Sequence, residues 1–132
     1  MPLEPGLVGE FSLVVMESDT ARSSGGESLP VVLSTPKMIS YMEQTAHHSV
    51  LPHLPAGQSS VGSVVNVRHL AATPIGWQVR FRSELVEVNE RRLRFKVEAW
   101  DDLEKIGEGE HERIIIDIAR FESRLEKKRN SL

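Results

Sequence analysis

The feature that most constrains this fold is a change of hydrophobic period near the middle of the chain. Across residues 34–51 the apolar side chains recur at three- and four-residue steps, which predicts one long amphipathic helix. From residue 60 onward the apolar positions alternate, which predicts strands with one buried face. One helix together with a run of antiparallel strands predicts an α+β domain in which the helix covers a sheet.

The predicted helix carries an apolar stripe that should face the core. Thr35 is its expected N-cap, Pro36 takes the first helical position, and Pro52 and Pro55 end it. The stripe consists of Met38, Ile39, Met42, Ala46 and Val50.

Five strands are expected around this helix. They cover residues 7–16, 61–70, 77–88, 92–101 and 104–118. The last four are expected to form an antiparallel meander, with tight reversals at 89–90 and 101–102. The side chains expected to point inward are Phe11, Leu13 and Val15, then Trp77, Val79, Phe81 and Leu85, then Leu93, Phe95, Val97 and Ala99.

Two segments outside these elements are polar. Residues 17–30 form a loop rich in glycine and serine, which is expected to be either a flexible lid over a site or disordered. Residues 122–132 form a charged C-terminal tail, expected as a short helix or a frayed end.

The composition excludes several classes of protein. A chain of 132 residues is long enough for one core, so residues 1–132 are expected to form a single domain. It contains no cysteine, which rules out disulfides, thiolate metal sites and cysteine nucleophiles. The net charge of −3 argues against a nucleic-acid-binding protein. No stretch approaches the ~20 apolar residues of a membrane span, and the N-terminus is unlike a signal peptide, so a cytoplasmic protein with no membrane partner is expected.

One residue breaks the apolar pattern of the helix. Glu43 lies four residues after Ile39 and three before Ala46, so its carboxylate shares or borders the stripe. Burial of a carboxylate is costly unless the group is paired or hydrogen-bonded. Two interpretations therefore remain open, a carboxylate kept for chemistry and a structural ion pair.

Thr35, Glu43 and His69 are the first group of candidate catalytic residues. Thr35 lies at the helix N-terminus, where free backbone N–H groups favour negative charge, and Glu43 follows about two turns later. His69 ends a predicted strand and is expected to share a face with Val61 and the valines at 65 and 67. A hydroxyl, a carboxylate and an imidazole together can activate water or form an acyl intermediate. The alternatives are a helix cap, a structural charge and a half-buried strand-end histidine.

A second candidate cluster lies on the last strand. Alternation places Gly107, Gly109, His111 and Arg113 on one face. Glycine inside a strand often marks close approach by a ligand, and an arginine beside it can hold a carboxylate, a phosphate or a carbonyl oxygen. The alternative is that Arg113 pairs with one of the nearby glutamates.

The remaining histidines and arginines carry weaker signals. His47, His48 and His53 have no carboxylate at metal-ligand spacing, so no metal site is expected. The arginines at positions 80, 82, 91, 92 and 94 form a basic hairpin. This hairpin is either simply solvated or in contact with a phosphate-rich ligand such as coenzyme A.

Three pieces of the sequence together resemble a known family. They are STPKMISYMEQTA, SVGSVVNVRHLAATPIG and IGEGEHERIIID, in this order between positions 31 and 121. The patterns H-x-A-A-T-P-x-G and G-x-G-x-H-x-R, which begin at His69 and Gly107, are weak alone and fairly specific together. With these pieces the chain resembles the hotdog-fold thioesterases related to fluoroacetyl-CoA thioesterase.

The resemblance implies a hotdog fold, an α+β arrangement in which an antiparallel β-sheet wraps a long central helix. It also implies a homodimer with active sites at the subunit interface, and hydrolysis of an acyl-CoA thioester without a cofactor. The family's catalytic residues fall on Thr35, Glu43 and His69, and its substrate-binding residues on Gly62 and Arg113, with His111 alongside. Glu43 would be the general base or the carboxylate nucleophile.

The chain departs from the family in one segment. The fluoroacetyl-specific enzyme closes its pocket with aromatic residues before the helix, whereas residues 23–33 here contain none. We therefore expect a small or medium acyl group broader than or different from fluoroacetyl. Two alternatives to a thioesterase remain, a non-catalytic acyl-CoA or acyl-ligand binding protein and a hydratase or dehydratase on the same scaffold. The sequence leaves open whether the acyl carrier is CoA or an acyl carrier protein.

Overall fold

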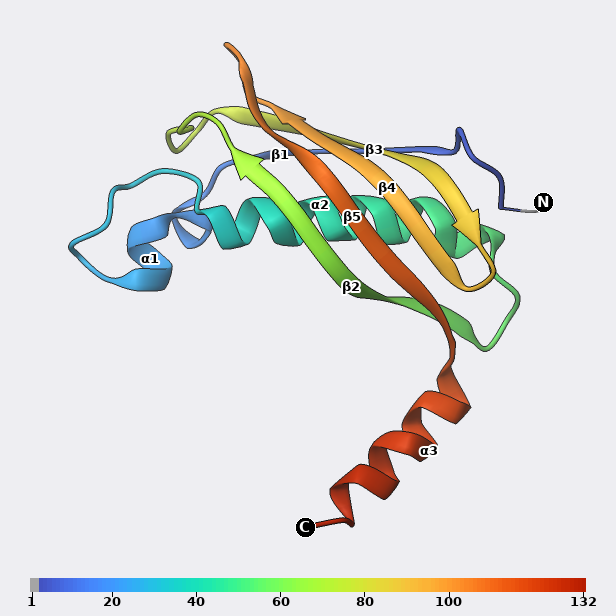
Figure 1. The fold of residues 1–132 in the computed structure, drawn as a ribbon. Helices are drawn as coiled ribbons and strands as arrows, with labels where there is room; N and C mark the ends of the chain where they lie inside the picture. Colours follow the sequence, from blue (N-terminus) through green and yellow to red (C-terminus); the bar gives the residue numbers. More distant parts are fainter. Residues whose placement is uncertain (1–2) are drawn as a thin grey trace.

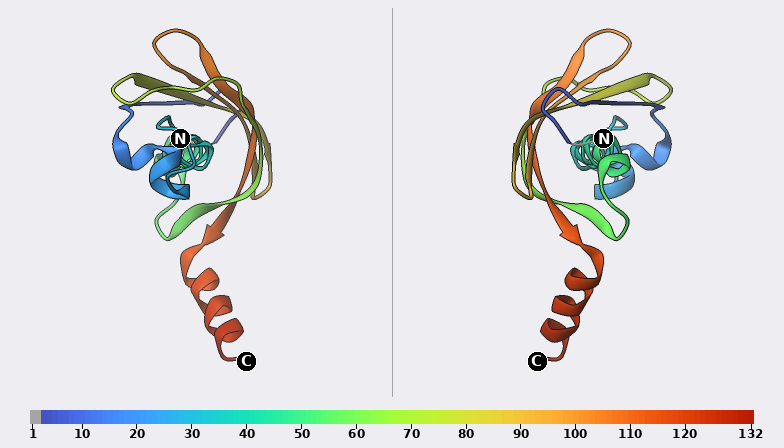
Figure 2. Two further views of the ribbon diagram at one scale, coloured as in Figure 1. Left: turned by 90° about the vertical axis from the view of Figure 1, so that its left-hand side faces the viewer. Right: turned by 90° about the vertical axis from the view of Figure 1, so that its right-hand side faces the viewer.

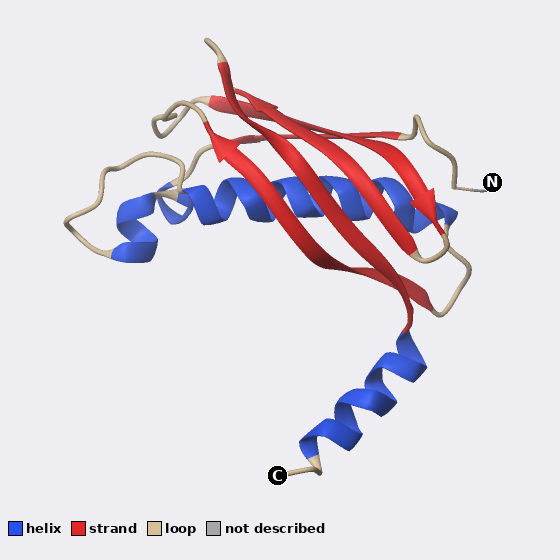
Figure 3. Cartoon of the chain, viewed as in Figure 1, coloured by secondary structure: helices blue, strands red, loops and turns tan. Residues whose placement is uncertain are grey.

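The computed structural model describes residues 3–132 as one curved antiparallel sheet with a long helix along its inner face (Figures 1 and 3). The elements are β1 (Val8–Val14), η1 (Glu17–Asp19), α1 (Ala21–Gly25), α2 (Thr35–Val50), η2 (Leu51–His53), β2 (Gln58–His69), β3 (Gln78–Asn89), β4 (Arg92–Trp100), β5 (Lys105–Asp117) and α3 (Ile118–Arg129). The predicted helix and all five predicted strands are confirmed, with ends that differ by a few residues.

The strand order is β1-β3-β4-β5-β2, and every neighbouring pair is antiparallel. β3, β4 and β5 form a meander as expected, but the predicted four-strand meander is wrong for β2, which pairs with β5 and not with β3. The reason lies in residues 70–77, which cross the end of the sheet rather than turning tightly. There Leu33 donates from its backbone N–H to the Thr73 carbonyl, and Val32 bridges Pro74. β2 is therefore an edge strand.

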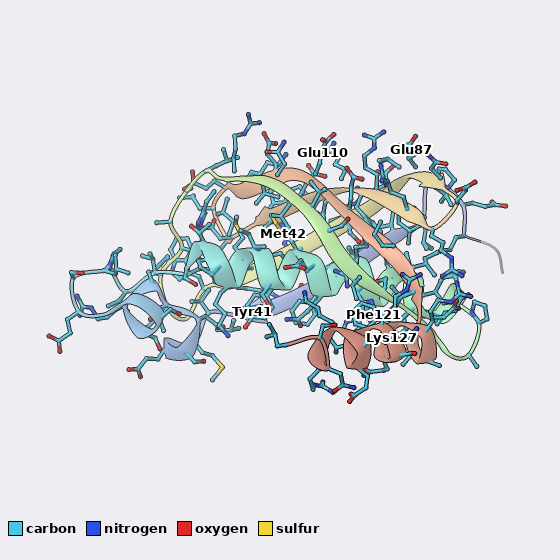
Figure 4. All side chains as sticks on the ribbon, turned by 60° about the horizontal axis from the view of Figure 1, so that its bottom comes forward. Tyr41, Met42, Glu87, Glu110, Phe121 and Lys127 are labelled. Carbon is cyan, nitrogen blue, oxygen red and sulfur yellow. The ribbon has the colours of Figure 1, made fainter. Side chains whose placement is uncertain are left out.

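The sheet curves around α2 and leaves the opposite side of this helix without strands (Figure 2). Met38, Met42, Ala46 and Val50 are fully buried against the sheet, as predicted, whereas Ile39 is only half-buried. Figure 4 shows Met42 on the sheet side of the helix. Burial of each large apolar side chain contributes about 1.5–3 kcal/mol, so this stripe fixes the helix on the sheet.

The inward faces of the strands largely follow the predicted alternation. The predicted residues that are fully buried are Val15, Val79, Phe81, Leu85, Leu93, Phe95, Val97 and Ala99. Trp77 lies before β3 and is half-buried, and Phe11 is partly exposed. At Gly107 a Cβ would lie 2.6 Å from the Met38 sulfur, so the helix approaches β5 closely where that strand has no side chain.

The start of α2 differs by one residue from the prediction. Ser34, and not Thr35, is the N-cap, because the Ser34 hydroxyl accepts a hydrogen bond from the Lys37 backbone N–H at 3.1 Å. Thr35 is the first helical residue, and Pro36 follows it. Two hydroxyl residues in succession make the cap ambiguous in sequence. The consequence is functional, since the Thr35 hydroxyl is left available for another partner.

Residues 17–30, expected as a structureless loop, contain η1 and α1. Asp19 organises the segment, because its carboxylate accepts hydrogen bonds from the Met16 backbone N–H at 2.9 Å and the Tyr41 hydroxyl at 2.5 Å. Thr20 then caps α1 by accepting from the Ser23 N–H. The expectation of plain disorder is therefore wrong, whereas motion as a lid stays a prediction.

The C-terminal tail is helical, as one of the two interpretations predicted. α3 begins at Ile118, earlier than expected, and it projects away from the rest of the fold (Figure 1). Phe121 and Leu125 on this helix are each about two-fifths exposed, at 40% and 41%. They take no part in the main core.

Candidate active site

The first functional pair lies at the N-terminus of α2. The Thr35 hydroxyl oxygen is 2.8 Å from His69 Nδ1, at the end of β2. His69 Nε2 is buried and has no hydrogen-bond partner. Burial lowers the pKa of His69, and the backbone of Ala71 opposes this shift only in part. The imidazole is therefore neutral at pH 7, and its Nε2 is a buried polar atom without a hydrogen-bond partner in residues 3–132.

A largely apolar cavity of about 410 Å³ opens beside this pair. The polypeptide before α2 contributes Ala21, Pro30 and Val32 to its wall, and the chain after β2 contributes Ala71 and Ala72. Two residues of the segment predicted as a lid, Ala21 and Pro30, thus line the same cavity as Thr35 and His69.

Glu43 belongs to a second group, further along the helix. Its side chain is 37% exposed, so the prediction that it borders the apolar stripe is confirmed. Its Oε2 is 3.6 Å from Arg113 Nη1. A Cβ at Gly62 would lie 2.7 Å from the same oxygen, so β2 accommodates the carboxylate only because this residue is glycine. The ion-pair interpretation and the chemical interpretation of Glu43 are both compatible with this geometry.

A β-bulge in β2 sets which residues reach this group. The register of β2 on β5 shifts between Gly62, opposite Arg113, and Val64, opposite Glu112. As a result Val61, which pairs with Ile114, lies on the face opposite to His69. The expectation that Val61 shares the face of His69 is therefore wrong, because strict alternation does not anticipate the extra residue.

Arg113 is the most closely held side chain of the second group. Only 7% exposed, it donates from Nε to Ser60 Oγ at 2.7 Å and from Nη2 to the Ser60 carbonyl at 2.9 Å. Its Nη1 is 3.2 Å from His111 Nε2. Since an arginine N–H can only donate, this nitrogen of His111 accepts, and Nδ1–H donates to the Val64 carbonyl at 2.8 Å.

Burial also affects the titration of these groups. It lowers the pKa of Arg113, and the Glu43 carboxylate opposes that shift. It lowers the pKa of His111 as well, with a hydrogen bond to Val64 acting in the other direction. His111 is therefore neutral at pH 7, which matches its role as an acceptor for Arg113.

Sequence reasoning missed two members of this group, Ser60 and His47. Ser60 is buried and its hydroxyl is 2.7 Å from His47 Nδ1. Two signals were present, because Ser60 precedes Gly62 by one strand period and His47 follows Glu43 by about one helical turn. A cavity of about 250 Å³ lies beside this group. It is lined by Ser40, Glu43, Gln44, His47 and Arg113.

The structure brings the six predicted site residues together as two groups rather than one. Thr35 meets His69, and Glu43 meets Gly62 and Arg113, with His111 behind. Between residues 3 and 132 no hydrogen bond or ion pair joins the two groups. Eight residues of helix separate Thr35 from Glu43, a rise of about 12 Å.

The other candidate groups lie elsewhere. In the described part of the chain, no cluster of three or more histidine, aspartate or glutamate side chains could hold a metal ion. Four arginines of the basic hairpin pair with carboxylates: Arg82 with Glu84, Arg91 with Asp117, Arg92 with Glu112, and Arg94 with Glu87. Glu87 and Glu110 are seen on the outer side of the sheet in Figure 4. None of the helices within residues 3–132 is long and apolar enough to cross a membrane.

Comparison with known proteins gives a consistent result. A family model described as fluoroacetyl-CoA-specific thioesterase (FlK) matches residues 15–119. A fluoroacetyl-CoA thioesterase from Streptantibioticus cattleyicolor is 37% identical over 99 residues, which cover 75% of this chain and 71% of that protein.

Comparison with solved structures identifies the same family of thioesterases. A crystal structure of the fluoroacetyl-CoA thioesterase superposes with a TM-score of 0.91 at 32% identity, covering 97% of this chain and 98% of the other. A Thermus thermophilus protein of the thioesterase superfamily gives 0.88 at 31% identity, covering 99% and 98%. A crystal structure of a phenylalanine-to-alanine mutant of the fluoroacetyl-CoA-specific thioesterase in complex with fluoroacetate and CoA gives a TM-score of 0.86 at 34% identity, covering 90% of this chain and 99% of the other.

Proposed function

Because the chain belongs to the family of fluoroacetyl-CoA-specific thioesterases, we propose that Glu43, Thr35 and His69 hydrolyse a small or medium acyl-CoA thioester. As a member of this family the protein is a thioester hydrolase that acts on acyl-CoA, releasing the free acid and CoA. The observation that supports our residue assignment best is the placement of the Glu43 carboxylate beside the Arg113 guanidinium and against the Gly62 backbone.

Each residue has a role that suits its surroundings. As a nucleophile, Glu43 attacks the thioester carbonyl, the C–S bond breaks to release the CoA thiolate, and water then hydrolyses the acyl–glutamate anhydride. As a general base, Glu43 instead takes the proton of a water molecule that attacks the carbonyl, and the same C–S bond breaks. Thr35 holds the His69 ring, and neutral His69 donates a hydrogen bond from Nε2–H to the departing thiolate sulfur without giving up this proton. A thiol leaves readily because its pKa is only about 8.5, so modest assistance by a neutral imidazole is sufficient.

Gly62, His111 and Arg113 bind the acyl end of the substrate in this proposal. Arg113 supplies a positive charge near the carbonyl oxygen, where negative charge develops in the transition state. Gly62 leaves room for the carbonyl next to Glu43, and His111 fixes one arm of the guanidinium.

A homodimer would complete the site. The rise of about 12 Å between Thr35 and Glu43 is too large for one thioester group to contact both within one chain. The strand-free side of α2 and the edge strand β2, with Val64 and Val65 more than two-fifths exposed at 44% and 43%, offer a surface for a second copy. We propose that Glu43 of one subunit faces Thr35 and His69 of the other.

Mixing two impaired variants tests this arrangement. A dimer of Glu43→Ala and Thr35→Val subunits has one site with both changes and one intact site. Thiol release should therefore recover to about half of the parent activity per mixed dimer. If mixing restores no activity although mixed dimers are recovered, each site lies within one chain.

The acyl group is expected to be broader than fluoroacetyl. The segment before α2 lines the first cavity with Ala21, Pro30 and Val32, and none of these is aromatic. The test is thiol release from a panel of acyl-CoA thioesters, from acetyl to long-chain and aromatic. Strict preference for fluoroacetyl-CoA would contradict the expectation. Binding without thiol release would favour an acyl-CoA binding protein, and a change in acyl unsaturation would favour a hydratase.

We also propose that the protein is located in the cytoplasm.

A further inference from the structure

Arg113 is held by a chain of hydrogen bonds that ends on a histidine outside the proposed catalytic set. Its Nε and Nη2 both donate to Ser60, one to the hydroxyl at 2.7 Å and one to the carbonyl at 2.9 Å. The Ser60 hydroxyl lies 2.7 Å from His47 Nδ1. Ser60 comes from β2, Arg113 from β5 and His47 from α2, so the chain ties together three elements.

The direction of these hydrogen bonds can be assigned. Because Arg113 Nε–H donates to the Ser60 oxygen, the hydroxyl proton is available to a second partner. A neutral His47 with its own proton on Nε2 can accept this proton at Nδ1, which lies 2.7 Å from the hydroxyl oxygen. A protonated His47 would instead donate to Ser60, and the hydroxyl proton would lose its acceptor. The neutral imidazole is therefore the form of His47 that gives the hydroxyl proton an acceptor.

The two hydrogen bonds from Arg113 to Ser60, called the Ser60 clamp below, affect how Arg113 can pair with Glu43. The Nε–Nη2 edge of a guanidinium is one that a carboxylate can engage with two parallel hydrogen bonds. Here Ser60 occupies that edge, and Glu43 stays 3.6 Å from Nη1, beyond the ~2.7–2.9 Å of a charge-assisted hydrogen bond. A carboxylate kept from a tight two-fold pair keeps its oxygens available to a substrate or a water molecule.

We propose that Ser60 and His47 are positioning residues that hold Arg113 apart from Glu43, and that only the neutral form of His47 allows this. The proposal rests on the catalytic role of Glu43 proposed above. It predicts that acidification disengages Arg113 as His47 becomes charged, independently of any protonation of His69.

The groups around His47 agree with a neutral ring. Arg113 faces it from β5, with His111 on the far side of that guanidinium, Glu43 and His48 lie on its own helix, and β2 contributes the uncharged Ser60. Burial, then the positive charge of Arg113, then His48 lower the pKa of His47. Glu43 is the only nearby carboxylate in this set, and it faces Arg113.

Two pairs of variants test the proposal. Ser60→Ala removes the clamp and Ser60→Thr keeps the hydroxyl, with Ser59→Ala, on the other face of β2, as a control. His47→Gln removes the titration and keeps a hydrogen-bond acceptor. His48→Gln is the comparison variant: it removes a neighbouring ring that lowers the pKa of His47, so the pH dependence should persist and shift only slightly. Each is measured by thiol release against pH and by the NMR signal of the Arg113 Nε–H.

The expected results differ between the variants. Ser60→Ala lowers kcat/KM about tenfold and broadens the Arg113 Nε–H signal at every pH, whereas Ser60→Thr restores both. In the parent protein the signal broadens on acidification, and the acid limb of the kcat/KM profile has the slope of two protons. In His47→Gln the Arg113 Nε–H signal no longer depends on pH. The slope of the acid limb of the kcat/KM profile falls from two protons to one.

Two results would overturn the inference: a sharp Arg113 Nε–H signal with parent kcat/KM in Ser60→Ala, or an unchanged pH dependence of that signal in His47→Gln. The NMR measurement does not need turnover. If the parent protein releases no thiol from any acyl-CoA, the proposed function fails while the hydrogen-bond chain is still decided. Should Ser60→Ala fail to fold, His47→Gln carries the decision alone.

Discussion

The two regions of the site on α2 differ in chemistry. At the helix N-terminus, Thr35 and His69 form a neutral hydroxyl–imidazole pair beside an apolar cavity. Two turns later, Glu43 lies beside the buried guanidinium of Arg113, within a dense set of hydrogen bonds. This difference supports our proposal that the charged region acts on the thioester carbonyl and the neutral region on the leaving thiol.

Loss of the carboxylate should have the largest effect. Glu43→Ala is expected to lower kcat by about 10²–10⁴-fold, the usual worth of a positioned base or nucleophile. The matched control is Glu122→Ala on the exposed helix α3, where parent kinetics are expected. The measurement is thiol release from an acyl-CoA that the parent protein hydrolyses. Parent turnover in Glu43→Ala would remove the charged region from the chemistry.

Disruption of the neutral pair should cost less. Thr35→Val deprives His69 Nδ1 of its partner at 2.8 Å and is expected to lower kcat by about tenfold to a hundredfold, because the imidazole itself remains. Thr35→Ser retains the hydroxyl and should stay close to the parent. Equal rates in the two variants would show that the hydrogen bond does not orient His69.

A methyl group at Gly62 probes the spacing within the charged region. Gly62→Ala places a Cβ 2.7 Å from Glu43 Oε2, so the carboxylate must move. We expect kcat/KM to fall about tenfold, with little change in Tm because this position is exposed. Ser63→Ala, at the same bulge, is the control. A loss of Tm without loss of activity would instead mean that the strand, and not the carboxylate, absorbs the clash.

The tether of the lid segment should have the smallest effect on turnover. Tyr41→Phe removes the hydrogen bond to Asp19 and is expected to lower the free energy of unfolding by about 1–3 kcal/mol, while kcat changes little. Chemical denaturation measures the first quantity, and thiol release the second. A large loss of kcat would show that η1 helps to build the neutral region.

The hydrogen bond between Tyr41 and Asp19 also predicts that the free energy of unfolding depends on pH in the alkaline range. Burial and the Asp19 carboxylate raise the pKa of Tyr41 from 10.0 to about 12. Below pH 10 both folded and unfolded chains keep the phenol proton, so the contact contributes fully. Between pH 10 and about 12 the unfolded chain loses this proton first, so stability falls as pH rises. Tyr41→Phe should flatten this part of the denaturation profile.

Local sequence patterns predicted the helix and the strands, but they did not predict which distant strands pair. The periodicity of residues 38–50 and 93–99 reflects which faces are buried, so helix and strands were predictable. The pairing of β2 with β5, in contrast, joins segments that lie far apart in the chain. The bulge after Gly62 is likewise a property of the pair and not of one strand.

The candidate site shows the same limit. Thr35, Glu43 and His69 were predicted by residue type and family resemblance, and the contact of Thr35 with His69 is present. Ser60 was missed because the partner of its hydroxyl, Arg113, lies 53 positions later in the chain, so no local pattern indicates this hydrogen bond. The shift of the helix cap from Thr35 to Ser34 depends on which of two adjacent hydroxyls meets a backbone N–H, a choice that packing decides.

The placement of the apolar cavity suggests how this scaffold can be re-engineered. Its wall before the helix comes from Ala21, Pro30 and Val32, none of which contacts Glu43 or Arg113 through any hydrogen bond or ion pair found in residues 3–132. Saturation libraries at these three codons can therefore screen for new acyl preferences while leaving the carboxylate centre intact. Selectivity and catalytic power would then be separately tunable traits of one small biocatalyst.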